Sequence, residues 1–370
     1  MRYSTTAFGL VLLLAVPPTA RAADAAGAEV VQGAAGTRLD IHLSALAERG
    51  FSGTVLVTQK GAVVLHKGYG LRERRAKKPC TVDTVFDIAS ITKHFTAAAI
   101  LKLEVQGKLK ATDPIAKHLP GVPPERSSIT IHHLLTHTAG LESVYGEDDD
   151  YLPKDLAIKL FMRMPLLSKP GEKYSYSNPG YSLLAAIIET ASGQSYETYL
   201  REQLWKPAGM EQTGYVLPTW DLGLVSHNYD AKGESHGHTF NRNWGPDGPW
   251  WHFFGNGGIL STTGDFLKWD EAVAAEKILP AAAREKLSTA HVRMGESESS
   301  YGYGTVVRKT ARGTRIVGHS GGSDWGVSTK YYRFPDDGIV VIAFSNLAAG
   351  TSRPDGVSFE ERLADLARME

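Results

Sequence analysis

The chain of 370 residues has little of several features that would narrow its function. A single cysteine, Cys80, rules out an intrachain disulfide or a site built from several thiolates. Its 40 Lys and Arg balance 40 Asp and Glu, so no net charge attracts nucleic acid or anionic lipid. No apolar run is long enough to cross a membrane. We therefore expect neither a nucleic-acid partner nor a membrane span, and the 42% of hydrophobic residues predict a large globular core.

The first 22 residues have the pattern of a secretory signal peptide. Arg2 precedes an apolar stretch at 7–16, and Ala20-Arg21-Ala22 forms a small-x-small cleavage site. We expect an exported protein, periplasmic or secreted, whose catalytic unit at 38–370 follows a small-residue spacer at 23–37.

The period of the hydrophobic pattern changes along the chain. Helical periodicity dominates between 88 and 286, and alternating or β-branched runs typical of strands lie on either side. The predicted strands are 51–58, 62–65, 304–309, 315–319, 326–334 and 339–344, and the predicted terminal helices are 39–48 and 359–369.

This arrangement predicts a mixed α/β fold of the α+β kind. It would contain a mainly antiparallel sheet built from both chain termini with flanking helices, plus an inserted all-helical domain. The predicted sheet domain comprises 38–86 and 300–370, and the helical domain comprises 87–299. A cleft between them is the natural place for a site.

The first candidate cluster is Ser90-Ile91-Thr92-Lys93, at the start of a stretch of helical period. At i and i+3 the hydroxyl and the amine share one helical face, so the amine, once deprotonated, can accept the hydroxyl proton. The positive end of the helix dipole also favours an oxyanion there. Ser90 as a helix cap and Lys93 as a solvated surface residue explain the pattern equally well.

The second cluster is Tyr176-Ser177-Asn178, shortly after the turn Pro170-Gly171. A tyrosine acts as a general base only if its pKa falls well below about 10, which requires a nearby cation such as Lys93. The Asn178 amide can orient a substrate carbonyl or the lysine. A plain turn followed by a helix start is the alternative.

The third cluster, Gly318-His319-Ser320-Gly321-Gly322, matches the G-x-S-x-G nucleophile elbow of lipases and esterases. An elbow needs a helix directly after the serine, but a strand is predicted at 327–334. None of the 13 histidines follows His319, although the α/β-hydrolase order requires one. Ser320 is therefore a poor nucleophile candidate. Consecutive glycines on a strand edge instead suit the approach of a substrate backbone, with an exposed amide as half of an oxyanion hole.

Taken in order, the Ser-x-x-Lys, Tyr-x-Asn and His-x-Gly motifs resemble the serine β-lactamase-related hydrolases, the group of class C β-lactamases, DD-peptidases and esterases. The segments 86–90, 133–141 and 174–178 add to the resemblance, which covers about residues 40–345.

The resemblance implies a serine hydrolase that works through an acyl-enzyme without a cofactor on a small-molecule, peptide or ester substrate. Ser90 would be the nucleophile, and Lys93 and Tyr176 would share the proton relay, with either one holding the proton at rest. Asn178 would position the substrate amide or ester.

The resemblance also assigns the glycine-containing strand to substrate binding. The backbone amides of Ser90 and Gly322 would form the oxyanion hole, and His319 and Gly321 would line the pocket. Class C β-lactamases have Lys in the place of His319. A histidine, largely neutral near pH 7, supplies a weaker fixed charge for a substrate carboxylate, so efficient hydrolysis of β-lactam antibiotics is not the leading expectation.

Two further features have alternative explanations. His133 and His137 have the i, i+4 spacing of metal ligands, but no acidic residue lies between them in the manner of zinc proteases, and we expect no metal. The Trp-rich run at 243–254 either lines an apolar pocket, which we favour slightly, or packs a long loop.

Overall fold

The computed structural model describes residues 28–147, 150–348 and 357–369. The predicted signal peptide lies outside these residues. None of the helices within the described ranges is long and apolar enough to span a membrane.

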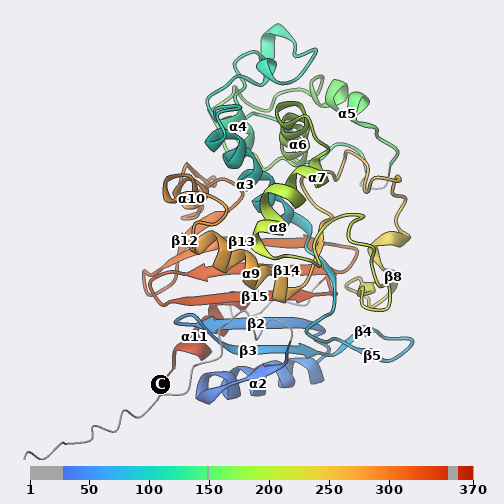
Figure 1. Cartoon of the computed structure of the whole chain (residues 1–370), viewed down its shortest axis with the longest axis vertical. Coiled ribbons are helices and arrows are strands. Elements are labelled where there is room, and N and C mark those ends of the chain that lie inside the picture. Colours follow the sequence, from blue (N-terminus) through green and yellow to red (C-terminus); the bar gives the residue numbers. More distant parts are fainter. Residues whose placement is uncertain (1–27, 148–149, 349–356, 370) are drawn as a thin grey trace, which may run out of the picture.

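A nine-stranded antiparallel sheet forms the centre of the molecule (Figure 1), in the order β1-β3-β2-β15-β14-β13-β12-β11-β10. Its strands are β1 Val30–Val31, β2 Gly53–Gln59, β3 Ala62–Tyr69, β10 Val292–Arg293, β11 Ser300–Tyr301, β12 Val306–Lys309, β13 Arg315–Ser323, β14 Val327–Phe334 and β15 Ile339–Ser345. Three short pairs lie outside it: β4 Leu71–Glu73 with β5 Lys78–Pro79, β6 Phe86–Asp87 with β9 Leu260–Ser261, and β7 Asn228–Tyr229 with β8 Ser235–Gly237.

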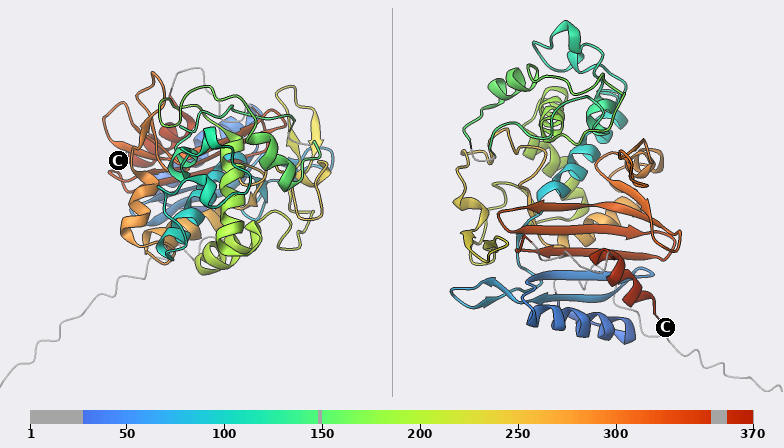
Figure 2. Two further views of the ribbon diagram at one scale, coloured as in Figure 1. Left: turned by 90° about the horizontal axis from the view of Figure 1, so that it is seen from above. Right: turned by 180° about the vertical axis from the view of Figure 1, so that it is seen from behind.

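The two ends of the chain meet in the middle of this sheet. β2 pairs with β15, with Val57 opposite Val341, so strands from the N-terminal and C-terminal segments are direct neighbours. Figure 2 shows the two segments side by side, blue against red. The predicted mixed fold, with an antiparallel sheet assembled from both termini, is confirmed.

Helices cover both faces of the sheet and extend beyond one of them. They are α2 Gly33–Glu48, α3 Thr92–Val105, α4 Ile131–Leu135, α5 Lys154–Phe161, α6 Asn178–Ser192, α7 Tyr196–Leu200, α8 Lys206–Ala208, α9 Thr263–Ala274, α10 Ala281–Ser288 and α11 Phe359–Arg368. Because successive strand residues point to opposite faces, Val55 and Val57 pack in the cluster of α2 and α11, while Leu56 joins the larger cluster that contains α3 and α9.

Helix α2 begins earlier than predicted. The sequence places residues 33–37 in the spacer at 23–37 because these residues are small. Gly36 is buried so close to β3 that a Cβ atom there would lie 2.3 Å from the Val64 carbonyl oxygen. Small residues thus allow this turn of helix to contact the strand.

The division into a sheet domain and a helical domain stays a prediction. Within the segment assigned to the helical domain, α9 packs against β2 and β15, and β10 joins the edge of the large sheet. Two-residue strands such as β10 carry too short a pattern for recognition by periodicity.

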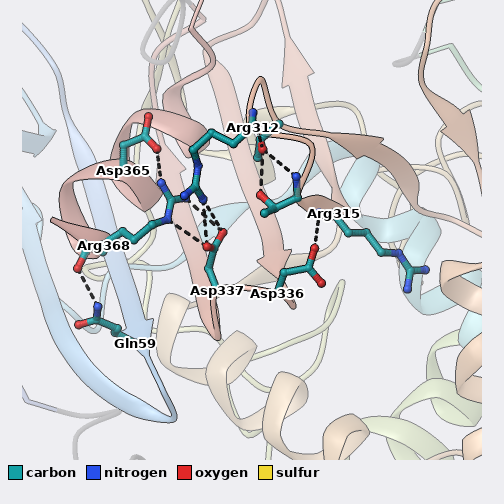
Figure 3. A network of polar contacts seen from close by, with 10 residues as sticks. Gln59, Arg312, Arg315, Asp336, Asp337, Asp365 and Arg368 are labelled. Carbon is teal, nitrogen blue, oxygen red and sulfur yellow. Dashed lines mark hydrogen bonds and ion pairs between the residues drawn. The ribbon is translucent and has the colours of Figure 1, made fainter.

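A polar network holds the C-terminal helix to the sheet (Figure 3). Asp337, in the turn between β14 and β15, accepts hydrogen bonds from Arg312, in the turn before β13, and from Arg368 at the end of α11. Asp336 accepts a hydrogen bond from the Arg315 amide at 2.8 Å. The network thus fixes the N-terminal end of β13, at Arg315.

Candidate active site

Ser90 lies in a tight 3-10 turn, Ala89–Ile91, directly before α3. Ala89 has a φ of +44°, a conformation that costs a non-glycine residue energy and needs support. The Asp87 carboxylate supplies part of it by accepting the Ala89 amide at 2.7 Å, and Thr329 of β14 donates to the Ile88 carbonyl at 3.0 Å. The turn is thereby fixed to the sheet, with Ser90 half-buried at its tip.

The alternative of a helix cap does not hold for Ser90. The cap residue of α3 is Ile91, and no side chain caps this helix. The Ser90 hydroxyl instead contacts Lys93, whose Nζ lies 3.1 Å from Ser90 Oγ. Lys93 is fully buried rather than solvated, which contradicts the surface alternative.

A backbone carbonyl holds Lys93 in place. Its Nζ donates to Asn256 O at 2.7 Å. Asn256 is itself fixed, because its side-chain amide donates to Ser182 Oγ at 2.9 Å and to the His252 carbonyl at 2.8 Å. Sequence reasoning missed Asn256 as a site residue. The one signal was its position among glycines at 255–258, where backbone groups are accessible for such contacts.

Tyr176 completes the contacts of Ser90. A hydrogen bond joins the two hydroxyls, and Lys93 Nζ lies 4.8 Å from the centre of the Tyr176 ring. Sequence reasoning required a tyrosine pKa lowered by this cation, but burial raises the pKa of Tyr176 above its ordinary value. Tyr176 is therefore a neutral phenol at rest, able to donate a proton or pass one on.

Asn178 is the first residue of α6, so it belongs to a helix start as well as to the site. Ser177 caps this helix by accepting the Gly180 amide at 3.2 Å. The backbone amide of Asn178 donates to the Ser143 carbonyl at 2.9 Å. Its Oδ1 is buried without a hydrogen-bond partner in the described part of the chain. The side chain therefore has a free acceptor near Tyr176.

Strand β13 passes beside the Ser90 turn. Within the described residues, the edge that pairs with β12 is unpaired along the second half of the strand. β12 pairs with β13 only from Arg315 to Gly318, so no described strand covers the same edge from His319 to Ser323. A Cβ on Gly321 would lie 2.3 Å from the Ile88 carbonyl oxygen, whereas on Gly322 its nearest neighbour would be 3.7 Å away. Gly321 therefore permits contact with the turn, and Gly322 has room for a Cβ atom without a close contact.

His319 is buried and both of its ring nitrogens have partners. Nδ1 lies 2.6 Å from the Ser320 carbonyl oxygen, and Nε2 lies 3.0 Å from the Tyr301 hydroxyl. A carbonyl can only accept, so Nδ1 carries the proton and Tyr301 donates to Nε2. Burial, reinforced by the charge of Lys93, lowers the pKa of His319 to about 3. The ring is thus neutral, as the sequence suggested.

Ser320 does not face this site. It alternates with His319 along β13, and its hydroxyl bonds to Tyr332, a member of the cluster beneath α2 and α11. The strand continues to Ser323 and is followed by β14 rather than a helix. The structure therefore contradicts the nucleophile-elbow alternative.

Two further features that the sequence singled out are His133 and the Trp-rich run at 243–254. His133 Nδ1 accepts the Thr130 amide at 3.2 Å, and across the described ranges no three His, Cys, Asp or Glu residues are grouped to hold a metal ion. Trp250, Trp251 and Phe254 of the Trp-rich run line a cavity of about 430 Å³ that does not include Ser90.

Comparison with known proteins agrees with this geometry. The Beta-lactamase family model matches residues 32–364. The chain is 32% identical over 316 residues to Penicillin-binding protein 4* of Bacillus subtilis, which covers 80% of this chain and 68% of that protein. It is 34% identical to the putative penicillin-binding protein PbpX of the same organism, over 71% of this chain and 63% of that one. The chain thus spans about two thirds of these relatives' length.

Solved structures show the same fold. A penicillin-binding protein homologue from Pyrococcus abyssi, described as octameric, superposes with a TM-score of 0.75 at 28% identity, covering 90% of this chain and 77% of that one. The hydrolase EstCE1 gives a TM-score of 0.75 at 21% identity over 90% of this chain and 99% of its own, which supports the fold alone. With the family model matched over nearly the whole described chain, this protein belongs to the Beta-lactamase family of serine hydrolases.

Proposed function

We propose that this chain is an exported hydrolase that cleaves an ester or amide bond through an acyl-enzyme on Ser90. The observation that carries the proposal is the 3.1 Å contact between Ser90 Oγ and the Nζ of the buried Lys93. A serine hydroxyl becomes a nucleophile when an adjacent base takes its proton. Export rests on the residue pattern at 1–22.

In the acylation step, Ser90 Oγ attacks the substrate carbonyl carbon while Lys93, in its neutral form, takes the hydroxyl proton. Negative charge develops on the carbonyl oxygen, which the backbone amides of Ser90 and Gly322 stabilise. When the bond to the leaving alcohol or amine breaks, that group receives a proton through the Tyr176 hydroxyl. Asn178 Oδ1, a free acceptor, orients a substrate that carries an amide N–H.

In the deacylation step, water attacks the acyl-Ser90 ester and gives its proton to the same relay. The bond from Ser90 Oγ to the acyl carbon breaks, the carboxylic acid leaves and the Ser90 hydroxyl is restored. Lys93 and Tyr176 therefore carry protons in both directions, as expected of a relay that serves two successive steps.

Substrate preference follows from the open strand edge. A substrate backbone can lie along β13 from His319 to Gly322, where no strand of the described chain pairs on that side. His319 is neutral and hydrogen-bonded at both nitrogens, so it offers no fixed positive charge to a substrate carboxylate. We therefore place esters and peptide amides ahead of β-lactams as substrates that are turned over efficiently.

A second candidate function is penicillin binding with slow turnover, as a peptidoglycan-directed or sensing protein. The names of the two Bacillus subtilis relatives favour it. Both candidates share acylation of Ser90 and differ in the rate at which water removes the acyl group.

Labelling and turnover test the proposal directly. The wild-type protein is expected to react with a fluorophosphonate probe and to hydrolyse a p-nitrophenyl ester, and Ser90→Ala is expected to do neither. Unchanged labelling and turnover in a folded Ser90→Ala variant would refute the proposal.

Fluorescent penicillin separates the two candidates. A label that persists for hours on the wild-type protein supports slow turnover, and rapid recovery of free enzyme supports a hydrolase. A panel of short and long acyl esters, D-Ala-D-Ala peptides and nitrocefin then identifies the preferred acyl donor, with Ser90→Ala as the blank for each substrate.

A further inference from the structure

His137 lies at the centre of an arrangement that the relay of Ser90, Lys93 and Tyr176 does not yet explain. It follows α4 and has a φ of +58°, a strained conformation for a residue with a side chain. Its side chain is buried, with 1% of its surface exposed. Strain of this kind persists only where the surrounding contacts impose it, so the contacts of His137 are informative.

Two of these contacts lie on either side of Tyr176. The Ser175 amide donates to the His137 carbonyl at 2.8 Å, and the Ser177 amide donates to His137 Nδ1 at 2.9 Å. One residue thus binds the backbone immediately before and immediately after Tyr176. In the same segment, the backbone amide of Asn178 donates to the Ser143 carbonyl.

The His137 ring also packs on the Tyr176 ring. Their centroids are 4.3 Å apart, and the His137 ring lies 4.6 Å from that of Tyr301 and 5.0 Å from that of Tyr181. Because Nδ1 accepts the Ser177 amide, the ring proton is on Nε2. Burial and the nearby charge of Lys93 hold the pKa of His137 well below its ordinary value, so this acceptor is retained throughout the neutral range.

We propose that His137 is a positioning residue that fixes the Tyr176 hydroxyl at Ser90 by clamping both flanking amides and packing on the tyrosine ring. This inference rests on the proposed function, in which Tyr176 passes protons to and from the leaving group and water. The relay needs the hydroxyl within hydrogen-bond reach of Ser90, and loop backbones hold such positions only when tied at several points. His137 does not itself take part in a chemical step of the reaction.

A pair of substitutions separates this role from simple packing. Asparagine and glycine both tolerate a positive φ, but only His137→Asn retains an acceptor, Oδ1, at the place of Nδ1. We expect His137→Gly to lower kcat by about 10- to 100-fold with KM little changed, and His137→Asn to recover most of that loss. Equal loss of kcat in both folded variants would show that the Nδ1 acceptor does not hold the Ser177 amide in place for catalysis, and would overturn the proposed clamp.

A double-mutant cycle with Tyr176→Phe gives the second test. If His137 acts through the Tyr176 hydroxyl, His137→Gly should cause little further loss of kcat once that hydroxyl has been removed. Additive losses would mean that His137 acts elsewhere, and the proposal would fail. Thermal unfolding measured on all four proteins confirms that the comparison is made between folded enzymes.

His133 provides the matched control. It lies four residues earlier, and its Nδ1 also accepts a backbone amide, that of Thr130, but the amide belongs to the start of α4 rather than to the Tyr176 loop. His133→Asn is expected to leave kcat unchanged. Ser90→Ala distinguishes a failure of the positioning role from a failure of the proposed function. If Ser90→Ala is inactive and the His137 variants are fully active, the positioning role is wrong and the proposed function stands.

Discussion

The turn that carries Ser90 and the strand that carries Ser320 both place a serine close in sequence to a basic side chain, with opposite results. Ser90 and Lys93 are three residues apart in a helical turn, and their side chains meet at 3.1 Å. His319 and Ser320 are adjacent on a strand, where neighbouring side chains point to opposite faces. Backbone geometry therefore decides which serine has a partner.

The surroundings of the two serines differ in the same sense. Beside Ser90 lie a fully buried amine and a neutral phenol, groups that can take up and pass on a proton. Beside Ser320 lies Tyr332 in the structural core under α2 and α11, and the imidazole of His319 is engaged elsewhere. The first region is arranged for chemistry, and the second supplies a surface along which a substrate can lie.

The largest expected effect tests this comparison at the serines themselves. Ser90→Ala should lower kcat/KM for a p-nitrophenyl ester by about ten-thousandfold, because the acceptor of the acyl group is lost. Ser320→Ala should change kcat/KM by less than about threefold, since its hydroxyl bonds to Tyr332 on the far face of the strand. Steady-state kinetics on both variants checks this, and a severe loss in a folded Ser320→Ala protein would break the comparison.

The sequence predicted the fold, and it predicted that two candidate site residues meet, because both rest on local patterns. Alternation of apolar residues predicted β2, β14 and β15, and the i, i+3 spacing predicted the meeting of Ser90 and Lys93. Strand-like patterns lie on both sides of a helical middle segment, and this arrangement predicted a sheet shared by the two ends of the chain.

Other parts of the site depend on contacts between distant residues and have no local pattern. The carbonyl of Asn256 reaches Lys93 across 163 residues, and Tyr301 reaches His319 from a two-residue strand. The pKa of Tyr176 is raised rather than lowered because burial outweighs the hydrogen bond with Ser90, a balance that only the packed structure reveals.

The next effect distinguishes the two glycines of β13. Gly321→Ala places a Cβ atom against the Ile88 carbonyl and the Thr329 hydroxyl, so the strand or the Ser90 turn must shift. We expect kcat/KM to fall by about 10- to 100-fold. Gly322→Ala keeps the backbone amide and brings its Cβ atom no closer than 3.7 Å to a neighbour, so kcat/KM should remain within about threefold of wild type. Equal effects of the two changes would contradict the close approach of β13 to the turn.

A smaller effect is expected where β11 supports His319. Tyr301→Phe removes the hydroxyl that donates to His319 Nε2 and leaves a buried acceptor unpaired, so kcat/KM should fall by about tenfold. Tyr303→Phe is the matched control, because Tyr303 makes the same kind of contact with His132 Nδ1 at 2.8 Å. Kinetics on both variants measures the difference. A similar loss in Tyr303→Phe would show that such pairs act on the whole fold rather than on the substrate strand.

The smallest effect concerns the opposite end of β13, where Asp337 joins Arg312 and Arg368 (Figure 3). Asp337→Asn should lower the free energy of unfolding by about 1 kcal/mol at pH 7 and leave kcat/KM unchanged, because the network lies away from Ser90. Thermal unfolding at pH 7 gives the stability, and the ester assay gives the activity. Asp365→Asn, which removes a half-exposed partner of Arg368, should have a smaller effect and serves as the control.

The pH dependence of that effect identifies its cause. The two arginines lower the pKa of Asp337 below its ordinary value, so the folded state binds its proton less readily than the unfolded state. The stabilisation is then complete above the unfolded pKa of about 4 and is lost as the pH falls through the lowered pKa of the folded state. The difference in unfolding temperature between wild type and Asp337→Asn should therefore be constant near neutral pH and shrink in strong acid. A difference that persists unchanged in acid would mean that the asparagine disturbs packing, and that charge pairing does not fix this end of the strand.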